Sequence, residues 1–509
     1  MDFRQKTLGS RIKFFIIILG LAIGQNAMSK TLKIFVGDEH HAPYDVKGDT
    51  SILGSTNPIL FGYLLKANET QEIFPGLIKK WHYDFKNNKY ILTLGSDKFH
   101  NGREINSFDL EFSLIRGFIS DFENYNKIHF SDIAGVEDLK VGMKYKTGMV
   151  SGIKVIDQKT IEISLKNVNP IFLINFTVPF VPLVPKEELK DDLYTWKSHP
   201  IGAGPYKIES DYKDNVLTLS SVSQLSAGFP SKIEYHTARK LEKYDVIFDR
   251  VVATDAEKKF SRVFSKYPAA INSIFFYRDN KFVENINFRK AIYHAIDRDA
   301  VAEGGELFKP AYEMLVRPYG GKVEIKNPYN LELAKEYVKK LPKEFFEKEF
   351  IVGVYSVSHA FTPVMIDRVK IMSEQLSKLG LKIKFEPNIE KFPTPEVMKK
   401  YSMKLWSKVV DLADPAVSFG AMSSFSPYKN EMPDSNGEYD RLYVRATQAN
   451  TFEGRLKGIQ DIANLIEEEA LIVPIMQRYV MYRFDPSTVE SLGDQARPLF
   501  MDISLVRMK

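Results

Sequence analysis

The sequence predicts an α/β protein, and three observations lead to that prediction. A chain of 509 residues with 44% hydrophobic content is long enough for two or three domains, each with its own core. Leu32 to Val36 form a short apolar run of strand length that ends in a polar segment. Further on, an amphipathic pattern over Val364 to Leu379 ends at Gly380, and the strand-like LKIKF follows directly. A helix followed at once by a strand is typical of α/β topology.

The first half of the chain predicts two strand pairs and a helix. The alternation over Tyr83 to Leu94, broken by Asn87 and Asn88, predicts a hairpin. Ser107 is expected to be the N-cap of a helix that carries acidic residues in its first turn, where they meet the positive end of the helix dipole. A second pair of strands is expected over Ser151 to Lys166, with its turn at Asp157 to Lys159.

The second half begins at a group of prolines that marks a crossing between structural units, because proline disrupts both helices and central strands. These are Pro179, Pro182 and Pro185. Strands are expected around residues 216–220 and 246–253, and amphipathic helices over 331–341 and 455–470. Beyond the last helix, IVPIMQRYVMYRF is expected to lead the chain from one structural unit back to another.

The N-terminus reads as a secretory signal peptide. Four basic residues precede an apolar run from Phe14 to Ile23, and Ala27-Met28-Ser29 forms a small-x-small cleavage site. Cleavage is expected after Ser29, with Ala22-Ile23-Gly24 as a rival site. An uncleaved anchor is disfavoured because ten apolar residues are about half of the ~20 that span a bilayer.

Charge and cysteine content exclude several classes of function. Removal of the first 29 residues leaves 66 Lys and Arg against 64 Asp and Glu, a net charge of +2. The lysines are dispersed among acidic residues, so we expect no nucleic-acid partner. The chain has no cysteine, which excludes disulfides, cysteine nucleophiles and thiolate metal sites.

Three segments occur in the order used by a known family of transport receptors. They are FPGLIKKWHYDFKNNKYILTLGSDKFHNGREINSFDLEFSLIRGF from Phe74, HPIGAGPYKIES from His199, and FFYRDNKFVENINFRKAIYHAIDRDAV from Phe275, the last expected to be a helix whose final turn carries Asp297 and Arg298. Together they resemble family 5 extracellular solute-binding proteins, the oligopeptide, dipeptide and nickel receptors of ABC importers. Residues 151–166 also resemble this family.

The resemblance implies a two-lobed periplasmic binding protein of the class II type, with an extra subdomain inserted in the first lobe. It implies that residues 30–50, 185–268 and 478–509 form lobe 1, residues 51–184 the inserted subdomain, and residues 269–477 lobe 2. Many relatives are anchored by a lipidated cysteine, which this sequence lacks. We therefore expect a freely diffusing, monomeric receptor in the periplasm of a Gram-negative cell.

The function implied is binding and transport, without catalysis or a cofactor. The receptor is expected to capture small peptides between its lobes and to deliver them to an ABC permease with its ATPase subunits. An alternative keeps the scaffold with another cargo, namely a nickel chelate, haem, an oligosaccharide or an opine-like compound, because fold does not settle ligand. A secreted hydrolase is a remote alternative, since neither an HExxH nor a GxSxG motif is present.

Asp411 is the residue that the resemblance marks most strongly. YSMKLWSKVVDLADP, residues 401–415, matches an aromatic-rich stretch of the family that ends in Asp-x-x-Asp-Pro. In peptide-binding relatives the first of these aspartates pairs with the α-ammonium of the ligand, a strong charge-assisted bond once both groups are desolvated. On the residues alone, Asp411 and Asp414 equally well cap and turn the chain ahead of Pro415.

Two neighbours of Asp411 are also candidates. Lys408 stands where the family has an aromatic residue, so it either selects a ligand carboxylate, pairs with Asp411, or extends into solvent. Trp406 is a candidate for the cleft, although a tryptophan in an apolar stretch is more often part of a core.

The remaining candidates lie in three loops. Asp38-Glu39-His40-His41 follow the first strand, where open α/β sheets place their ligands. They could hold a metal or haem, but adjacent histidines diverge in an extended loop, so contact of His40 and His41 with ligand is favoured. Tyr125, His359 and Phe361 lie where relatives approach the ligand.

Two further motifs are expected to be structural. Gly202 and Gly204 are expected to form a tight turn rather than a phosphate loop, because Pro205 removes an amide donor and no GxGxxG follows. Arg289, Asp297 and Arg298 are expected to hold their helix by ion pairs.

Overall fold

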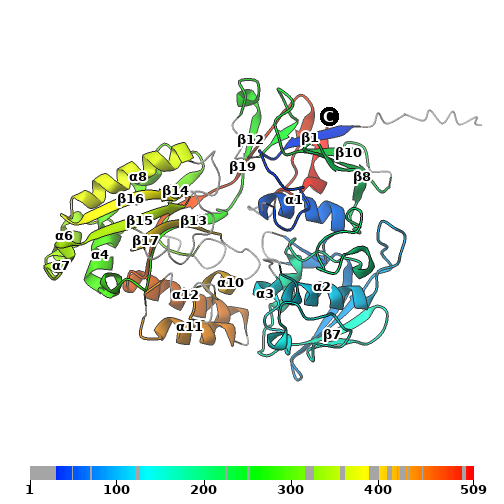
Figure 1. Ribbon diagram of the computed structural model, residues 1–509, viewed down its shortest axis with the longest axis horizontal. Helices are drawn as coiled ribbons and strands as arrows, with labels where there is room; N and C mark the ends of the chain where they lie inside the picture. Colours follow the sequence, from blue (N-terminus) through cyan, green and yellow to red (C-terminus); the bar gives the residue numbers. More distant parts are fainter. Residues whose placement is uncertain are drawn as a thin grey trace, which may run out of the picture.

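The computed structural model confirms a two-lobed α/β fold. It describes residues 30–48, 50–68, 72–121, 126–223, 226–248, 253–315, 326–355, 362–388, 400–409, 415–420, 422–424, 432–433, 435–449, 451–495 and 500–509. In Figure 1 the left half holds the yellow and orange elements, and the right half combines the blue, cyan and red ones. Among these described residues, no helix combines the length and the apolar character needed to cross a bilayer.

The first lobe is built on a seven-stranded sheet drawn from both ends of the chain. Its strand order is β12-β19-β11-β1-β10-β9-β8. The sheet is mixed, because β1 runs parallel to both β10 and β11 whereas the outer pairs are antiparallel. The bounds are β1 Thr31–Phe35, β8 Tyr206–Lys213, β9 Val216–Ser221, β10 Lys232–His236, β11 Val246–Ile247, β12 Ser261–Phe264 and β19 Met481–Phe484. A small pair, β20 Val489–Ser491 and β21 Arg507–Met508, joins its core.

Helix α1, Thr50–Phe61, packs on this sheet. Its side chains Ile52, Ile59 and Leu60 are buried in one core with Leu32 and Ile34 of β1. The expected boundary at residue 51 put this helix in the inserted subdomain. The first buried residue of the second core is Leu64, and the boundary at residue 51 stays a prediction.

The inserted subdomain has its own core beneath a four-stranded antiparallel sheet, β4-β5-β7-β6. The two predicted strand pairs are present, with Asn88 at positive φ in the first turn. The bounds are β4 Ile78–Asp84, β5 Lys89–Leu94, β6 Ile153–Val155, β7 Thr160–Ser164, α2 Ser107–Ile119 and α3 Asn126–His129, with β2 Leu65–Ala67 and β3 Ile73–Pro75 as a separate pair.

The predicted N-cap of α2 is wrong by one residue. Asn106 is the N-cap, because its side chain accepts hydrogen bonds from the amides of Phe108 and Asp109. The Asp109 carboxylate accepts in return from the Asn106 amide at 2.9 Å, which completes a capping box. Ser107 is therefore the first helical residue and is buried.

The second lobe is a six-stranded sheet with a core on each face. Its order is β14-β18-β13-β17-β15-β16, with β15 parallel to both β16 and β17. The strands are β13 Ala270–Phe276, β14 Phe308–Pro310, β15 Glu349–Tyr355, β16 Lys382–Asn388, β17 Met403–Val409 and β18 Ile472–Arg478. The helices are α4 Ile286–Ala295, α5 Arg298–Ala302, α6 Leu331–Val338, α7 Glu344–Glu347, α8 Thr362–Ser377, α10 Pro415–Gly420, α11 Glu438–Thr447 and α12 Phe452–Glu468.

Two crossings join the lobes, and they lie side by side. The chain passes from β12 to β13 and returns from β18 to β19, so the paired strands of one sheet continue into those of the other (Figure 1). Between the two ladders, the Ser265 amide donates to the Val480 carbonyl at 2.8 Å, and the Val480 amide donates to the Ser265 hydroxyl at 3.0 Å. The Ala269 amide donates to the Arg478 carbonyl at 2.8 Å. The hinge is thus a two-stranded antiparallel ribbon.

The segment after β13 corrects two predictions about Arg289, Asp297 and Arg298. The expected single helix is interrupted after Ala295, and Asp297 is the N-cap of α5 instead of part of a final turn. Arg298 is fully buried and donates to the carbonyls of Tyr293, Ile296 and Pro474 at 2.6 to 3.0 Å. Arg289 likewise donates to main-chain carbonyls. Both arginines thus donate mainly to main-chain carbonyls, several of them at helix ends. Arg289 also forms the predicted kind of ion pair, at 3.9 Å from the Glu469 carboxylate.

Gly202 and Gly204 of the GAGPY motif are required for a reason other than the predicted tight turn. Neither Gly202 nor Gly204 has a positive φ. Instead, a Cβ at either position would overlap the carbonyl groups of Ile59 and Leu60 at the end of α1. Glycine is required here because the backbone approaches the helix closely.

Candidate functional site

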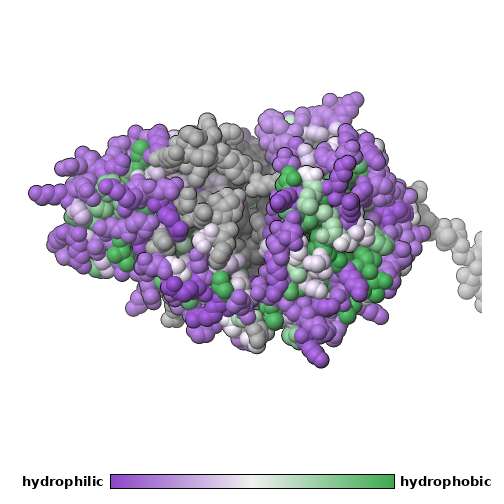
Figure 2. Space-filling model, turned by 60° about the horizontal axis from the view of Figure 1, so that its bottom comes forward, coloured by the Kyte–Doolittle hydropathy of each residue, from purple (hydrophilic) through white to green (hydrophobic). Residues whose placement is uncertain are grey.

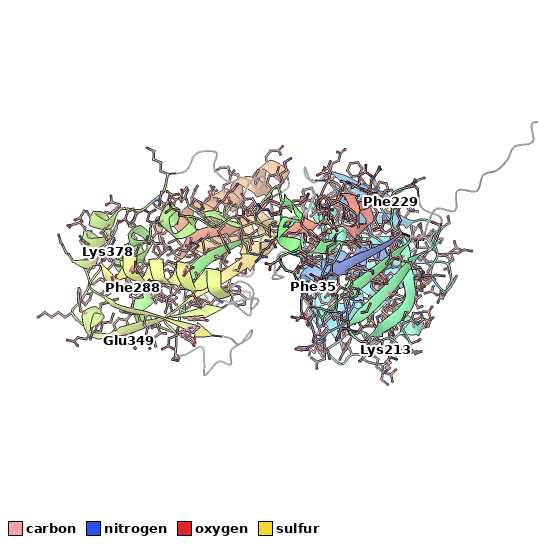
Figure 3. All side chains as sticks on the ribbon, turned by 90° about the horizontal axis from the view of Figure 1, so that it is seen from above. Phe35, Lys213, Phe229, Phe288, Glu349 and Lys378 are labelled. Atoms are coloured by element: carbon pink, nitrogen blue, oxygen red, sulfur yellow. The ribbon has the colours of Figure 1, made fainter. Side chains whose placement is uncertain are left out.

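The carboxyl ends of the parallel strands in the two large sheets face each other. Figure 3 shows Phe35, the last residue of β1, on the side of its half that faces the other half. Glu349, the first residue of β15, lies toward the outer side of the opposite half, so β15 and its parallel neighbours run inward. Ligands of open α/β sheets bind outside the carboxyl ends of the strands. The space between these two edges is therefore the candidate site.

On the first lobe, the loop after β1 continues the pairing of that strand. The Glu39 amide donates to the Thr237 carbonyl at 2.9 Å, beyond the end of β10. The Glu39 carboxylate accepts from the amides of His40 and His41, and His41 Nδ1 lies 3.1 Å from an Asp45 carboxylate oxygen. His40 is exposed and His41 half-buried. The carboxylates of Glu39 and Asp45 are therefore engaged by contacts within this loop.

This loop shows no metal site. Within the part of the chain that the structure describes, no group of three or more His, Cys, Asp or Glu side chains is placed to hold a metal ion. The expectation that His40 and His41 contact the ligand stays a prediction.

A stacked platform supports the same edge of the first lobe. The rings of Phe35 and Tyr244 stack with centroids 5.0 Å apart, and the Arg239 guanidinium lies over both, 4.6 Å from the Phe35 centroid. Arg239 makes two hydrogen bonds, of 3.1 and 3.0 Å, to the fully buried carboxylate of Glu257. That carboxylate also accepts from the Thr254 amide at 2.9 Å. Three separate segments, at Phe35, at Arg239 to Tyr244 and at Thr254 to Glu257, are thereby held together at the end of β1.

His236, the last residue of β10, lies against this platform. Its ring meets Tyr244 edge-on at 5.0 Å, and Nε2 lies 3.3 Å from a Glu234 carboxylate oxygen. Burial lowers the pKa of His236 below its usual value, against a smaller opposing effect of Glu234. The ring is therefore neutral near pH 7.

On the second lobe, one face of β17 carries Lys404, Trp406 and Lys408, because alternate residues of a strand share a face. The buried Lys404 ammonium lies 5.3 to 5.8 Å from the ring centroids of Phe275, Tyr277 and Trp406. The Trp406 ring packs against the core that contains Phe275. Lys408 is half-buried and stands next to Val409, where the strand ends at the candidate site.

The other predicted site residues lie outside the described part of the chain. They are Asp411, Asp414, Tyr125, His359 and Phe361. Along the chain, residues 410–414 connect β17 to α10, and residues 356–361 connect β15 to α8. The proposed ligand roles of these five residues stay predictions.

Sequence reasoning missed the platform of Arg239, Tyr244 and Glu257. Arg239 and Glu257 are 18 residues apart, each in a stretch of mixed charge that is typical of a solvated loop. Lys404 was missed as well. Its position between the buried Met403 and Leu405 on a strand would have placed it on the same face as Trp406.

Comparison with known proteins identifies a family and a fold. Residues 72–430 match the family described as bacterial extracellular solute-binding proteins, family 5 Middle. A protein of Brucella ovis that is named as an ABC transporter peptide-binding protein is 25% identical over 245 residues, 44% of this chain and 43% of that protein. The periplasmic oligopeptide-binding protein OppA of Salmonella typhimurium is 27% identical over 158 residues, 30% of this chain and 28% of OppA. The sequence matches thus span less than half of these relatives.

Solved structures of the same architecture cover nearly the whole chain. The murein tripeptide-binding protein MppA of Escherichia coli has a TM-score of 0.73 at 16% identity, covering 95% of this chain and 99% of MppA. OppA of Haemophilus influenzae, in complex with the peptide RPPGFSPFR, has a TM-score of 0.72 at 14% identity, covering 94% and 99%. NikA of Brucella suis, in complex with Fe(III)-EDTA, also reaches 0.73 at 14% identity, covering 94% and 100%. At these identities the likeness shows the fold alone.

Proposed function

The chain belongs to the bacterial extracellular solute-binding proteins of family 5, and from this membership we propose that it is a receptor for small peptides. It captures the peptide between its two lobes and delivers it to the permease and ATPase subunits of an ABC importer. The observation that carries this proposal is the pair of opposed strand edges, joined by one paired hinge.

The hinge supports capture by closure. Each lobe has its own sheet and cores, whereas the link between the two sheets consists of paired main chain around Ser265 and Val480. A ribbon of two strands bends more easily than either packed lobe deforms. A ligand that touches both edges stabilises the closed form, and a permease distinguishes that form from the open one.

The polar groups at the two edges suit a peptide. Asp411 comes two residues after the end of β17 in the sequence and supplies a carboxylate for the α-ammonium of the ligand. Lys408 adds a cation near the same strand end, suited to a carboxylate of the ligand. The loop after β1 offers His40 from the first lobe. Main-chain hydrogen bonds and water in side pockets then allow peptides of varied sequence to bind.

The proposal includes export and a division of the chain. The receptor is a periplasmic monomer whose signal peptide, residues 1–29, is removed. Residues 30–50, 185–268 and 478–509 form lobe 1, residues 51–184 the inserted subdomain and residues 269–477 lobe 2. Helix α1 falls in the range of the inserted subdomain, but its buried side chains pack in the core of lobe 1. Binding is stoichiometric, without turnover of the ligand.

Native mass spectrometry of the protein recovered from the periplasm tests the cargo. Denaturing release is expected to yield a ladder of peptide masses, which gives their lengths directly. A single non-peptide mass or a metal chelate would retain the receptor and overturn the peptide assignment. Release of reaction products from an added peptide would overturn the non-catalytic role.

A second experiment tests Asp411. Replacing Asp411 with Asn is expected to weaken binding of a free peptide about 100-fold, because a desolvated ammonium loses its partner. An N-acetylated version of the peptide should bind the wild type and D411N equally poorly. Asp367→Asn, an exposed change of the same kind on α8, serves as the matched control and should leave both affinities unchanged. Equal losses for free and acetylated peptides on D411N would refute the ammonium role.

A further inference from the structure

One stretch of the inserted subdomain is basic throughout. Residues 139–156 contain four lysines and no acidic residue, although acidic residues nearly balance basic ones in the chain as a whole. The lysines are Lys140, Lys144, Lys146 and Lys154, and all four are exposed. No ion pair joins any of them to another described residue, in contrast to Lys159 and Lys166 just beyond. Acidic residues adjoin the stretch, namely Asp138, Asp157 and Glu162 opposite Lys154, but none forms an ion pair with these four lysines.

Apolar side chains are exposed among these lysines. Val141 and Ile156 are each 50% exposed, Met143 is 41% exposed, and Phe108 of the adjoining helix α2 is 38% exposed. Figure 2, which brings the bottom of Figure 1 forward, shows hydrophobic residues gathered on the right half of the molecule, where the inserted subdomain lies. We call residues 139–156 together with Phe108 the basic apolar surface.

The basic apolar surface is held in place by a buried carboxylate. Glu111 of α2 is fully buried and accepts from the Tyr145 hydroxyl at 3.0 Å and from the Gly148 amide at 2.7 Å. The Tyr145 ring meets Phe112 edge-on at 5.0 Å, and the Gly142 amide donates to the Ile119 carbonyl at 2.8 Å. The loop is thus fastened along the length of α2, and its ordering adds little to the cost of binding a partner.

A groove of about 590 Å³ runs beside this loop. Its lining is mixed: the apolar members are Phe108, Val150, Ile153, Val155 and Ile156, and Thr147, Ser151, Lys154 and Gln158 are among the polar ones. Two acidic residues also line it. Glu111 is engaged by Tyr145 and Gly148, and Asp157 accepts from the amides of Lys159 and Thr160 at 2.7 and 2.8 Å. The groove thus offers apolar groups beside one cation, Lys154.

We propose that the basic apolar surface binds an anionic phospholipid membrane. Lysines near such a surface are attracted by its negative potential, and interleaved aliphatic side chains enter the boundary between headgroups and acyl chains. Lysines without an ion pair to any described residue, interleaved with Val141, Met143 and Ile156 on one anchored segment, match this requirement. An acidic protein would call for fixed partners to each ammonium and for fewer exposed aliphatic groups at the same positions. Contact with the membrane concentrates the receptor where a permease is embedded.

Vesicle co-sedimentation tests the proposal. The exported protein is mixed with vesicles of 30% phosphatidylglycerol in phosphatidylcholine and with vesicles of phosphatidylcholine alone, at low salt and at 0.5 M NaCl. Binding is expected only with the anionic vesicles and should weaken strongly at high salt. Each Lys→Gln change is expected to lower the partition coefficient about fivefold. K140Q/K144Q/K146Q/K154Q should therefore abolish detectable binding.

A matched control separates this surface from net charge. K343Q/K348Q/K370Q/K378Q removes four exposed lysines from the second lobe and should bind anionic vesicles as the wild type does. V141S/M143S/I156S should keep the salt dependence while lowering partition, because only the apolar insertion is lost. Equal losses in the two lysine variants would overturn the proposal. Binding to polyglutamate without binding to vesicles would also overturn it and would assign the surface to an acidic protein.

Discussion

Replacing Arg239 with Met tests whether the ion pair with Glu257 stabilises the carboxyl edge of the first lobe. The change leaves the buried Glu257 carboxylate with the Thr254 amide as its remaining partner among the contacts described above. Breaking a buried pair by removing one partner costs about 3 to 5 kcal/mol. The Arg239 side chain is 28% exposed, so water relieves part of that cost. We expect a loss of about 2 to 4 kcal/mol in local stability.

A double-mutant cycle isolates the pair. Glu257→Gln keeps an acceptor for the arginine and removes the buried charge, so a smaller loss of about 1 to 2 kcal/mol is expected. In the double variant no buried charge is left uncompensated, and its loss should be smaller than the sum of the two single losses by about 1 to 2 kcal/mol.

Hydrogen exchange followed by mass spectrometry is the appropriate assay, because a chain with several cores does not unfold in a single two-state step. Peptides that cover β1 and the segment between β10 and β11 should lose protection in R239M, while peptides from the six-stranded sheet should not change. Losses that add to within about 0.5 kcal/mol would show that Arg239 and Glu257 act independently and would refute the reasoning.

Three further predictions concern the packing between units, pH and the hinge. Gly202→Ala should lower the melting temperature by several degrees or prevent folding, since the added Cβ overlaps the Leu60 carbonyl. Gly102→Ala is the control, because a Cβ there meets open space and the positive φ adds only some strain. Burial lowers the pKa of His100, so below about pH 6.5 the unfolded chain takes up a proton that the folded state resists, and stability falls with falling pH. His100→Asn should therefore reduce the dependence of the melting temperature on pH between pH 7.5 and 5.5. An unchanged slope would contradict this. Ser265→Ala leaves the Val480 amide without its hydroxyl acceptor, which should cost about 1 to 3 kcal/mol in local protection of the hinge and change ligand affinity; intact protection at Val480 would argue against a role for this bond.

The sequence predicted the secondary structure well where apolar residues recur at a regular spacing. The alternation over residues 83–94 and the helical pattern over residues 364–379 correspond to the β4–β5 hairpin and to α8. Both patterns reflect one face buried against one core, which is a local property of the chain.

Predictions failed where two local arrangements were equally compatible with the sequence and a distant or reciprocal contact decided between them. Asn106 and Ser107 are both good caps, and the return hydrogen bond from Asp109 selects Asn106. The stretch through Asp297 and Arg298 looks like a continuous helix. Its break is stabilised by the buried Arg298, which donates to Pro474 far along the chain. Such contacts leave no periodic signal.

The candidate site was only partly accessible to sequence reasoning. Resemblance pointed to Asp411, and alternation along β17 placed Lys408 and Trp406 on one face. The platform around Glu257 depends on the folding of three segments onto one edge, and a buried carboxylate in a charged stretch looks the same in sequence as an exposed one.

The order of strands in the first lobe has a consequence for export. Strand β19, at residues 481–484, lies between β12 and β11, so the seven-stranded sheet stays open until almost the whole chain has been synthesised. At about 5 to 20 residues per second, synthesis takes on the order of 25 to 100 s. During that time the sheet lacks β19 and the edge strand β12 that pairs with it, so the proposed export would act on a chain whose first lobe is incomplete. The interleaving of the two ends of the chain thus makes completion of the first lobe one of the last steps of folding.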